Sequence, residues 1–232
     1  MKKVLLFLAS LAFLRPNLTA YKSLDTKTVK ISENTTKINF QDILVQKYVL
    51  KIYKLACEEG NGLSLTECYS LAEKIRIIAL EEDLPFETAL LIVAIESSFQ
   101  PKAYNKWGNA YGLCQVTVLC LREYNWNHGT NYTLDDTYDI DLNLHVGFWY
   151  YHRILNHYND YYDFLTTTSN KKKLRDAYIA YNVGVTVFSN LGRQGRNELR
   201  RGLYPKKIGG CKKGSPYKPL YRFNNLYDKW YS

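Results

Sequence analysis

The sequence lacks the patterns that usually hold a metal ion. It contains no Cys-x-x-Cys pair, and its four histidines do not show the spacing of a metal site. They are His128, His145, His152 and His157. We therefore interpret the histidines as isolated surface or core residues, and we expect neither a metal nor another cofactor.

Long apolar segments are also scarce. The one candidate, Val4 to Leu14, follows Met1-Lys2-Lys3 and is too short to span a bilayer comfortably. A basic start followed by a short apolar run is typical of a secretory signal, so we predict a signal peptide over residues 1–20. Cleavage is expected at Ala20, with Ala12 as an alternative. An uncleaved membrane anchor is disfavoured because Arg15-Pro16-Asn17 interrupts the apolar run at once. No cysteine lies near the cleavage region, so a lipoprotein has no support.

Acidic residues are outnumbered. The chain has 22 of them against 31 lysines and arginines, which gives a formal charge of +9. Removal of residues 1–20 takes away Lys2, Lys3 and Arg15 but no acid, and lowers the charge to +6. A basic exported protein fits an anionic partner such as cell wall or a membrane surface. Nucleic acid would fit the charge alone, but export argues against it.

Cysteine is limited to five residues, an odd number that leaves one without a partner in any fully paired scheme. Export permits disulfides. Cys57 with Cys68 would close the turn between two predicted helices, and Cys114 with Cys120 is a second possibility. Cys211 has no obvious partner, and the pairing stays open.

A clean alternating strand pattern is absent, whereas helical periodicity is frequent. Residues 21–40 show no sustained apolar period, and we interpret them as a flexible segment. The whole chain has 46% hydrophobic residues, which is typical of a globular protein, and we interpret residues 41–232 as one domain. Residues 193–213 are basic and rich in glycine, and we expect a loop there. Helices are predicted over residues 41–58, 64–82, from about Pro85 to Glu96, and over 115–124, 139–157, 174–182 and 217–231.

The most informative stretch begins at Glu96, the end of the apolar run Ala89–Ile95. On a helix Ala89, Ile92 and Val93 share the face of Glu96, and that face should pack inward. Burial disfavours the charged carboxylate and raises its pKa, and the negative end of the helix dipole acts in the same direction. A carboxyl that stays protonated near neutral pH is suited to general acid catalysis. The alternative from this residue alone is a solvent-facing Glu at a helix end.

Three sequence blocks occur in order. They are Glu96-Ser97-Ser98-Phe99-Gln100-Pro101-x-Ala103, then Gly112-Leu113-Cys114-Gln115-Val116, then Ala180-Tyr181-Asn182-x-Gly184. In order and approximate spacing they resemble the lysozyme-like lytic transglycosylases of the soluble Slt type, over about Leu71 to Tyr231. Cys114 stands where the family usually has Met. The resemblance implies a mainly α-helical, lysozyme-like domain with a substrate cleft and at most a small β-hairpin.

The resemblance also implies an activity and a set of site residues. The family cleaves the glycan strand of peptidoglycan between N-acetylmuramic acid and N-acetylglucosamine, with Glu96 as acid and then base, and leaves an anhydro-sugar end. Ser97 would bind near the reacting sugar, and Tyr181 and Asn182 would line the cleft. The Leu113-Cys114 backbone and Gln115 would hold the acetamido group.

Two other functions stay open at this stage. A lysozyme-type hydrolase on the same fold would need a second carboxylate, from Asp135, Asp136, Asp139 or Asp141. A non-catalytic wall-binding protein is disfavoured, because Glu96 is retained with all three blocks. We expect a monomer in the periplasm or cell envelope, compatible with peripheral membrane contact. The sequence leaves open whether a wall-spanning secretion or conjugation apparatus is a partner.

Overall fold

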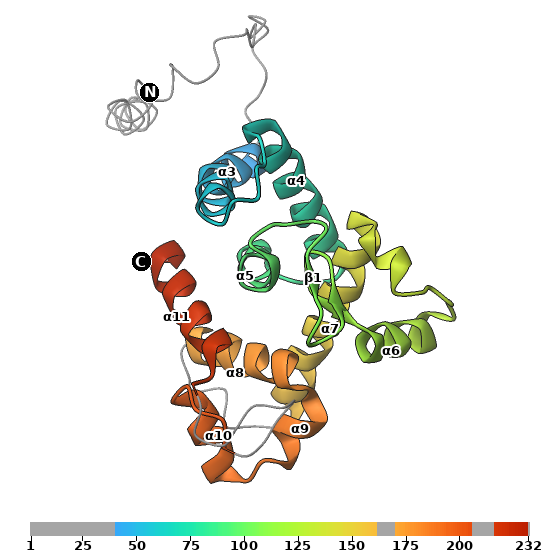
Figure 1. Cartoon of the computed structure of the whole chain (residues 1–232), viewed down its shortest axis with the longest axis vertical. Helices are drawn as coiled ribbons and strands as arrows, with labels where there is room; N and C mark the ends of the chain where they lie inside the picture. Colours follow the sequence, from blue (N-terminus) through green and yellow to red (C-terminus); the bar gives the residue numbers. More distant parts are fainter. Residues whose placement is uncertain (1–39, 162–169, 206–215, 232) are drawn as a thin grey trace, which may run out of the picture. The chain divides into compact units, whose positions relative to one another are not determined.

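The computed structural model describes residues 40–161, 170–205 and 216–231 (Figure 1). The predicted signal peptide, nearly all of the predicted flexible segment, and Cys211 lie outside these residues. The described part is mainly helical, as expected. Its elements are α3 (Phe40–Glu58), α4 (Leu65–Glu81), α5 (Phe86–Ser97), β1 (Tyr104–Asn105), β2 (Ala110–Tyr111), β3 (Val116–Thr117), α6 (Val118–His128), the 3-10 helix η1 (Asp135–Tyr138), α7 (Ile140–Tyr161), α8 (Asn170–Val183), α9 (Val185–Asn190), α10 (Arg193–Arg200) and α11 (Lys218–Tyr231).

The first two helices, α3 and α4, pack against each other as a hairpin. Tyr48, Ile52 and Leu55, three members of the predicted apolar stripe on α3, are buried. A capping box begins α4, because the Ser64 side chain accepts from Glu67 N and the Glu67 carboxylate accepts from Ser64 N at 2.8 Å. These two bonds satisfy backbone donors that have no partner within the helix.

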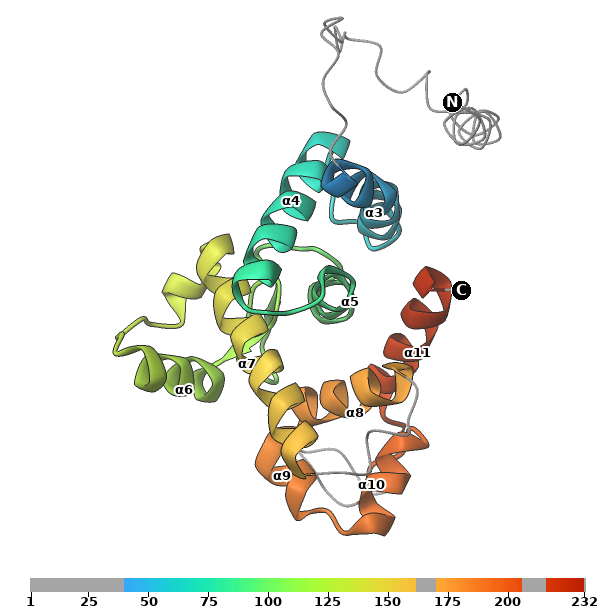
Figure 2. The same ribbon diagram turned by 180° about the vertical axis from the view of Figure 1, so that it is seen from behind.

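The apolar helix α5 is the core of the domain. Its residues from Ala89 to Ile95 are all buried, which is why this segment has no polar face. Helices α4 and α11 pack against it, and Figures 1 and 2 show α11 beside α5 from opposite sides. Pro85 precedes the helix as its N-cap, where its missing N–H removes no helical hydrogen bond. The inward packing predicted for the face of Glu96 is thus confirmed.

A small antiparallel sheet follows α5, with the strand order β1–β2–β3. Tyr104 is opposite Tyr111, and Tyr111 is opposite Val116. Each strand has two residues, too few to produce an alternating pattern in the sequence. The sheet has one strand more than the small hairpin that the resemblance implied.

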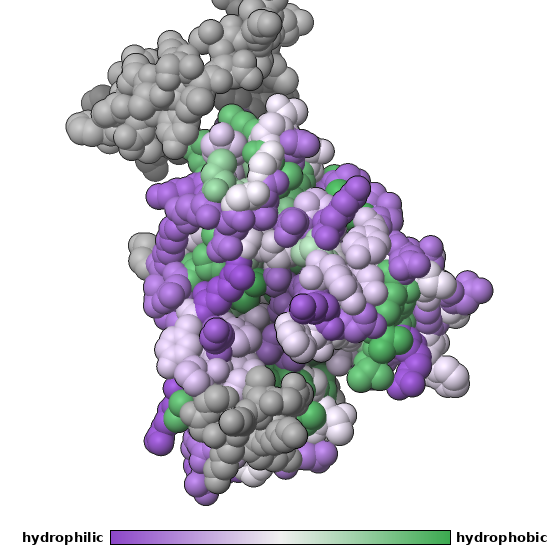
Figure 3. Space-filling model, viewed as in Figure 1, coloured by the Kyte–Doolittle hydropathy of each residue, from purple (hydrophilic) through white to green (hydrophobic). Residues whose placement is uncertain are grey.

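Helix α6 begins three residues later than predicted. Gln115 has φ of 51°, which is incompatible with a right-handed helix, and the Thr117 side chain caps α6 by accepting from Cys120 N at 3.4 Å. The helix ends at Gly129, whose left-handed conformation suits a residue without a Cβ. Figure 3 shows apolar surface over α6, where Val118 and Leu119 are 54% and 63% exposed.

The expectation of a loop over residues 193–213 is wrong for its first part, which forms α10. The segment has few apolar residues, but its Leu199 is fully buried. Arg200 at the end of α10 also donates to both carboxylate oxygens of the buried Asp176 in α8, at 3.0 and 2.6 Å. This paired charge anchors a helix that hydrophobic periodicity alone does not reveal.

Residues around Gly184 also depart from the prediction in detail. Gly184 has a positive φ and an extended ψ of 135°, and directly after α8 it begins α9, a helix that was not predicted. The closing helix α11 agrees with the prediction, and Leu220, Phe223 and Trp230 on it are buried.

Candidate active site

Glu96 lies in the last turn of α5 and is partly buried. Its Oε1 has no solvent-exposed surface and no hydrogen-bond partner within the described residues. A buried carboxylate oxygen without a partner is unfavourable when charged. The local structure therefore favours the protonated acid.

The pKa of Glu96 is raised from 4.5 to about 7. Burial is the main cause and raises it, whereas a hydrogen bond with Tyr178 and the positive charge of Arg222 lower it. The group therefore has access to both protonation states near neutral pH, as an acid that later acts as a base requires. No second carboxylate is among the groups of the described chain that shift this pKa.

Aromatic hydroxyls and one thiol surround Glu96. Burial is the main reason that the pKa values of Tyr178, Tyr181, Tyr217 and Cys114 lie well above their ordinary values, and the negative charge of Glu96 contributes to each. All four groups stay neutral near pH 7. Apart from the Arg222 cation, Glu96 is therefore surrounded by groups that are neutral near pH 7.

The loop Gly112–Gln115 is fixed against α7 by Asn143. The Asn143 Oδ1 accepts from Cys114 N at 2.8 Å, and its Nδ2 donates to Tyr111 O at 2.9 Å and to Thr137 O at 2.7 Å. Gly147, one turn further on α7, contacts Cys114 so closely that a Cβ there would lie 2.3 Å from the Cys114 Cβ. Gly147 therefore permits the close packing of α7 against this loop.

Tyr181 connects α8 to the same loop. Its hydroxyl donates to Cys114 O at 2.7 Å, and its ring packs on those of Tyr150 and Tyr151, with ring centroids 5.7 and 5.8 Å apart. The neighbouring Asn182 is exposed and accepts from the Tyr217 hydroxyl at 3.0 Å. Both residues are thus held in place by side chains from other elements.

Several residues that were predicted to contact the substrate form hydrogen bonds within the fold or are buried. The Ser97 hydroxyl donates to Val93 O within α5 at 3.1 Å, and Leu113 and Cys114 are fully buried. Gln115 uses its amide nitrogen within the loop, donating to Ala103 O at 3.3 Å and Gly112 O at 3.0 Å. The Cys114 N–H and C=O are bonded to Asn143 and Tyr181.

Cysteines in the described residues are free thiols. Cys57 is exposed, and Cys68, Cys114 and Cys120 are buried. Neither of the two pairings considered from the sequence is formed. Burial raises the pKa of Cys68 to about 11, so this thiol is uncharged and behaves as a small apolar group.

Sequence reasoning missed Tyr178, Tyr217 and Arg222. Tyr178 lies three residues before Tyr181, so its place on the same face of α8 could have been found from helical spacing. Tyr217 and Arg222 come from the C-terminal segment, and no local pattern links them to Glu96. Their role depends on how α11 packs against α5 and α8.

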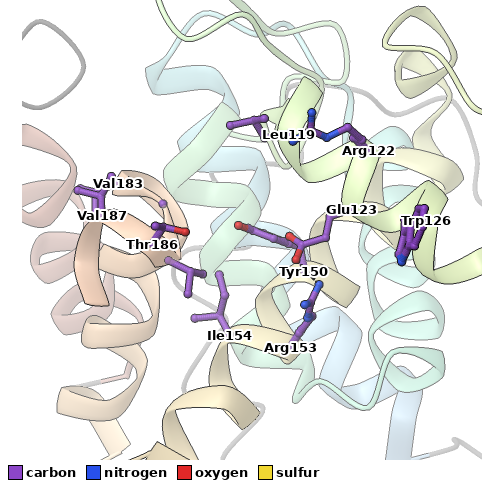
Figure 4. A pocket seen from close by; sticks show the side chains of 12 residues that line it. Leu119, Arg122, Glu123, Trp126, Tyr150, Arg153, Ile154, Val183, Thr186 and Val187 are labelled. Carbon is purple, nitrogen blue, oxygen red and sulfur yellow. Dashed lines mark hydrogen bonds and ion pairs between the residues drawn. The ribbon is translucent and has the colours of Figure 1, made fainter. Parts of the chain in front are cut away.

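A pocket of about 700 Å³ lies between α6, α7 and α9, next to this site (Figure 4). Tyr150, which contacts the ring of Tyr181, is part of its wall. Leu119 and Trp126 come from α6, and Glu123 forms an ion pair with Arg153 of α7. The remaining lining residues are Arg122, Ile154, Val183, Gly184, Val185, Thr186 and Val187. Apolar walls with a few polar groups are typical of ligand pockets.

The described ranges 40–161, 170–205 and 216–231 contain no group of three or more His, Cys, Asp or Glu side chains placed to hold a metal ion. None of their helices is long and apolar enough to cross a bilayer.

A comparison with known proteins identifies the family of the chain. No curated protein matches the chain. The family model described as "Transglycosylase SLT domain" matches residues 73–201, which is more than half of the chain and includes Glu96, the Gly112–Gln115 loop and Tyr181. The family acts on peptidoglycan, which implies an extracytoplasmic location. The chain therefore belongs to the transglycosylase SLT domain family.

Proposed function

We propose that the protein is a lytic transglycosylase that cleaves peptidoglycan between N-acetylmuramic acid and N-acetylglucosamine without water. The observation that carries this proposal is Glu96, an isolated and partly buried carboxyl with a pKa of about 7. One carboxyl of this kind can serve first as acid and then as base, so the reaction needs no second carboxylate.

In the first step the protonated Glu96 donates its proton to the glycosidic oxygen. The bond from this oxygen to C1 of the muramic residue breaks, and the N-acetylglucosamine side leaves with a hydroxyl group. Positive charge develops on the muramic ring while Glu96 becomes a carboxylate. The Tyr178 hydrogen bond and the charge of Arg222, which both lower the pKa of Glu96, stabilise this carboxylate.

In the second step the Glu96 carboxylate takes the proton of the muramic C6 hydroxyl. The C6 oxygen attacks C1 of the same sugar, and the ring closes to an anhydro-muramic end. Glu96 is then protonated again and ready for another cycle. Atoms and charges balance without a water molecule.

Substrate contacts are proposed for those polar side chains of the predicted site that have exposed surface. Asn182 is exposed, and Gln115 and Tyr181 are partly exposed, so each has surface available to a sugar. We assign Ser97, Leu113 and Cys114 to support of these groups, because their polar atoms are bonded within the fold or their side chains are buried. The pocket beside Tyr150 would accept a further part of the glycan strand.

The competing reaction is hydrolysis by a lysozyme-type mechanism. It requires a second carboxylate about 5 to 10 Å from the acid. Asp136 accepts from Thr133 N and Oγ1, Asp139 accepts from Leu142 N, and Asp141 pairs with Lys74. Asp135 differs from these three, and its negative charge contributes to the raised pKa of Tyr111 in the sheet. Asp135 is therefore the carboxylate whose replacement best tests the hydrolase mechanism.

Mass spectrometry of fragments released from purified sacculi tests the proposal. The wild type should release fragments with anhydro-muramic ends, Asp135→Asn should do the same, and Glu96→Gln should release none. Reducing ends that disappear in Asp135→Asn would indicate a hydrolase. Binding to sacculi without any release would indicate a wall-binding protein. We further propose that the protein acts in the periplasm or cell envelope.

A further inference from the structure

Arg222 connects the C-terminal helix α11 to the end of α5, close to Glu96. Its Nη2 donates to Ala94 O at 3.2 Å and to Ser98 Oγ. Ala94 O already accepts from Ser98 N, at 3.2 Å. The carbonyl end of a helix carries partial negative charge, so a guanidinium is well suited as a second donor at this position.

The turn that Arg222 contacts has an unusual backbone. Ser98 and Phe99 follow Glu96 closely and both have positive φ, at 53° and 64°. Residues with a Cβ are disfavoured in this conformation, by about 1 kcal/mol or more each. The surrounding contacts must therefore hold the turn, and with it the direction in which Glu96 points.

Two further contacts fix this turn from outside the matched family segment 73–201. The fully buried ring of Phe99 stacks on Trp230 of α11, with centroids 5.9 Å apart and planes 8° from parallel. Asn61, after α3, donates to Ser98 O at 2.6 Å. Residues before and after the matched segment thus contribute to the placement of Glu96. Of the three residues described, Asn61, Trp230 and Arg222, only Arg222 carries a charge.

The charged and titratable groups around this centre come from several elements. Tyr178 and Tyr181 of α8, Cys114 of the loop and Tyr217 before α11 surround Glu96. These groups are neutral near pH 7. The positive charge of Arg222 lowers the pKa of Glu96, and Arg222 also forms an ion pair with Glu59, with Nη2 to Oε1 at 3.6 Å. Glu59 therefore competes with Glu96 for the same cation.

We propose that Arg222 is a positioning residue for the reaction at Glu96: it anchors the left-handed turn Ser98–Phe99 and stabilises the carboxylate that remains after Glu96 has given up its proton. Glu59 moderates this effect by sharing the guanidinium. The inference rests on the proposed function for its catalytic meaning. Its electrostatic part holds for any reaction that Glu96 performs.

The pH dependence of kcat/KM provides the first test. The reaction begins with protonated Glu96, so activity falls as pH rises through its pKa. Arg222→Gln should move this alkaline limb to higher pH by up to about one unit, because an opposite charge is removed. Arg222→Lys should leave the limb in place, while kcat falls about tenfold with little change in KM because the turn is less well fixed. A merely structural role would lower activity without moving the limb.

Glu59→Gln provides a test of opposite sign at a half-exposed residue. Loss of this carboxylate leaves the full charge of Arg222 to Glu96, so the alkaline limb should move to lower pH. Lys229→Gln is the matched control, since Lys229 is another cation of α11 and pairs with Glu58 at 3.3 Å. It should leave the limb unchanged. A limb that stays in place in Arg222→Gln, or moves the same way in Arg222→Gln and Glu59→Gln, overturns the inference.

A direct titration separates this inference from the proposed function. Carbon NMR of glutamate carboxyl groups, with Glu96→Gln used for assignment, reports the Glu96 pKa without any substrate. The pKa should rise in Arg222→Gln and fall in Glu59→Gln, whichever products the enzyme makes. Unchanged titration in folded Arg222→Gln refutes the role of Arg222. Absence of anhydro ends from the wild type refutes the proposed function instead.

Discussion

Replacement of Asn143 by Ala should destabilise the domain and loosen the loop beside Glu96. Asn143 is 1% exposed, and its side chain makes three hydrogen bonds to the backbone of Cys114, Tyr111 and Thr137. These backbone groups belong to the loop Gly112–Gln115, the sheet and the 3-10 helix η1. One side chain of α7 thus connects the sheet and the loop that adjoins it to η1.

The magnitude follows from the number of partners. A hydrogen bond contributes about 1 kcal/mol net, and a buried polar group left without a partner costs about 1 to 3 kcal/mol. Water can reach part of the space near Tyr111, which is only partly buried. We therefore expect Asn143→Ala to lower the free energy of unfolding by about 3 kcal/mol. This is a large share of the about 5 to 15 kcal/mol of a typical domain.

Urea unfolding, followed by circular dichroism, measures this loss. Asn156→Ala is the matched control, because Asn156 lies on the same helix α7 and is exposed. It should change the unfolding free energy by less than about 0.5 kcal/mol. A loss below about 1 kcal/mol in Asn143→Ala, or one equal to that of the control, would refute the reasoning.

Three further predictions follow. Glu96→Gln should gain stability relative to the wild type as pH rises from 4.5 to 7, by up to about 3 kcal/mol, because the unfolded wild type then releases the Glu96 proton while the folded state still holds it. A difference that is independent of pH in urea unfolding would contradict this. Gly147→Ala should cost about 1 to 3 kcal/mol through its clash with Cys114, whereas thermal unfolding of Gly192→Ala, where a Cβ meets open space, should shift far less. Tyr181→Phe should cost about 1 kcal/mol through loss of the bond to Cys114 O, and an unchanged melting temperature would show that this bond contributes nothing.

Part of the site was predictable because it depends on local pattern. The apolar run before Glu96 specifies a buried helix, and Ser64 with Glu67 specifies the start of α4, since both signals act over a few residues. Gly147 lies inside the helix predicted over residues 139–157, where a glycine is typical of close packing. The contact that uses it, Cys114, could be named only from the structure.

The rest depends on contacts between distant segments. The strands of the sheet are too short for an alternating pattern, and α10 is anchored by one buried residue and the Arg200–Asp176 pair. The left-handed turn at Ser98 has no glycine to announce it. Arg222 reaches it from 124 residues away in the chain, a contact that no local pattern reveals.

Digestion of purified sacculi in water labelled with heavy oxygen tests the central claim most directly. If Glu96 alone acts as acid and base, the muramic ends released by the wild type are anhydro ends that contain no labelled oxygen, and Glu96→Gln releases none. Labelled reducing ends would show that water attacks the sugar. That result would contradict the single-carboxyl mechanism and require a second catalytic carboxylate.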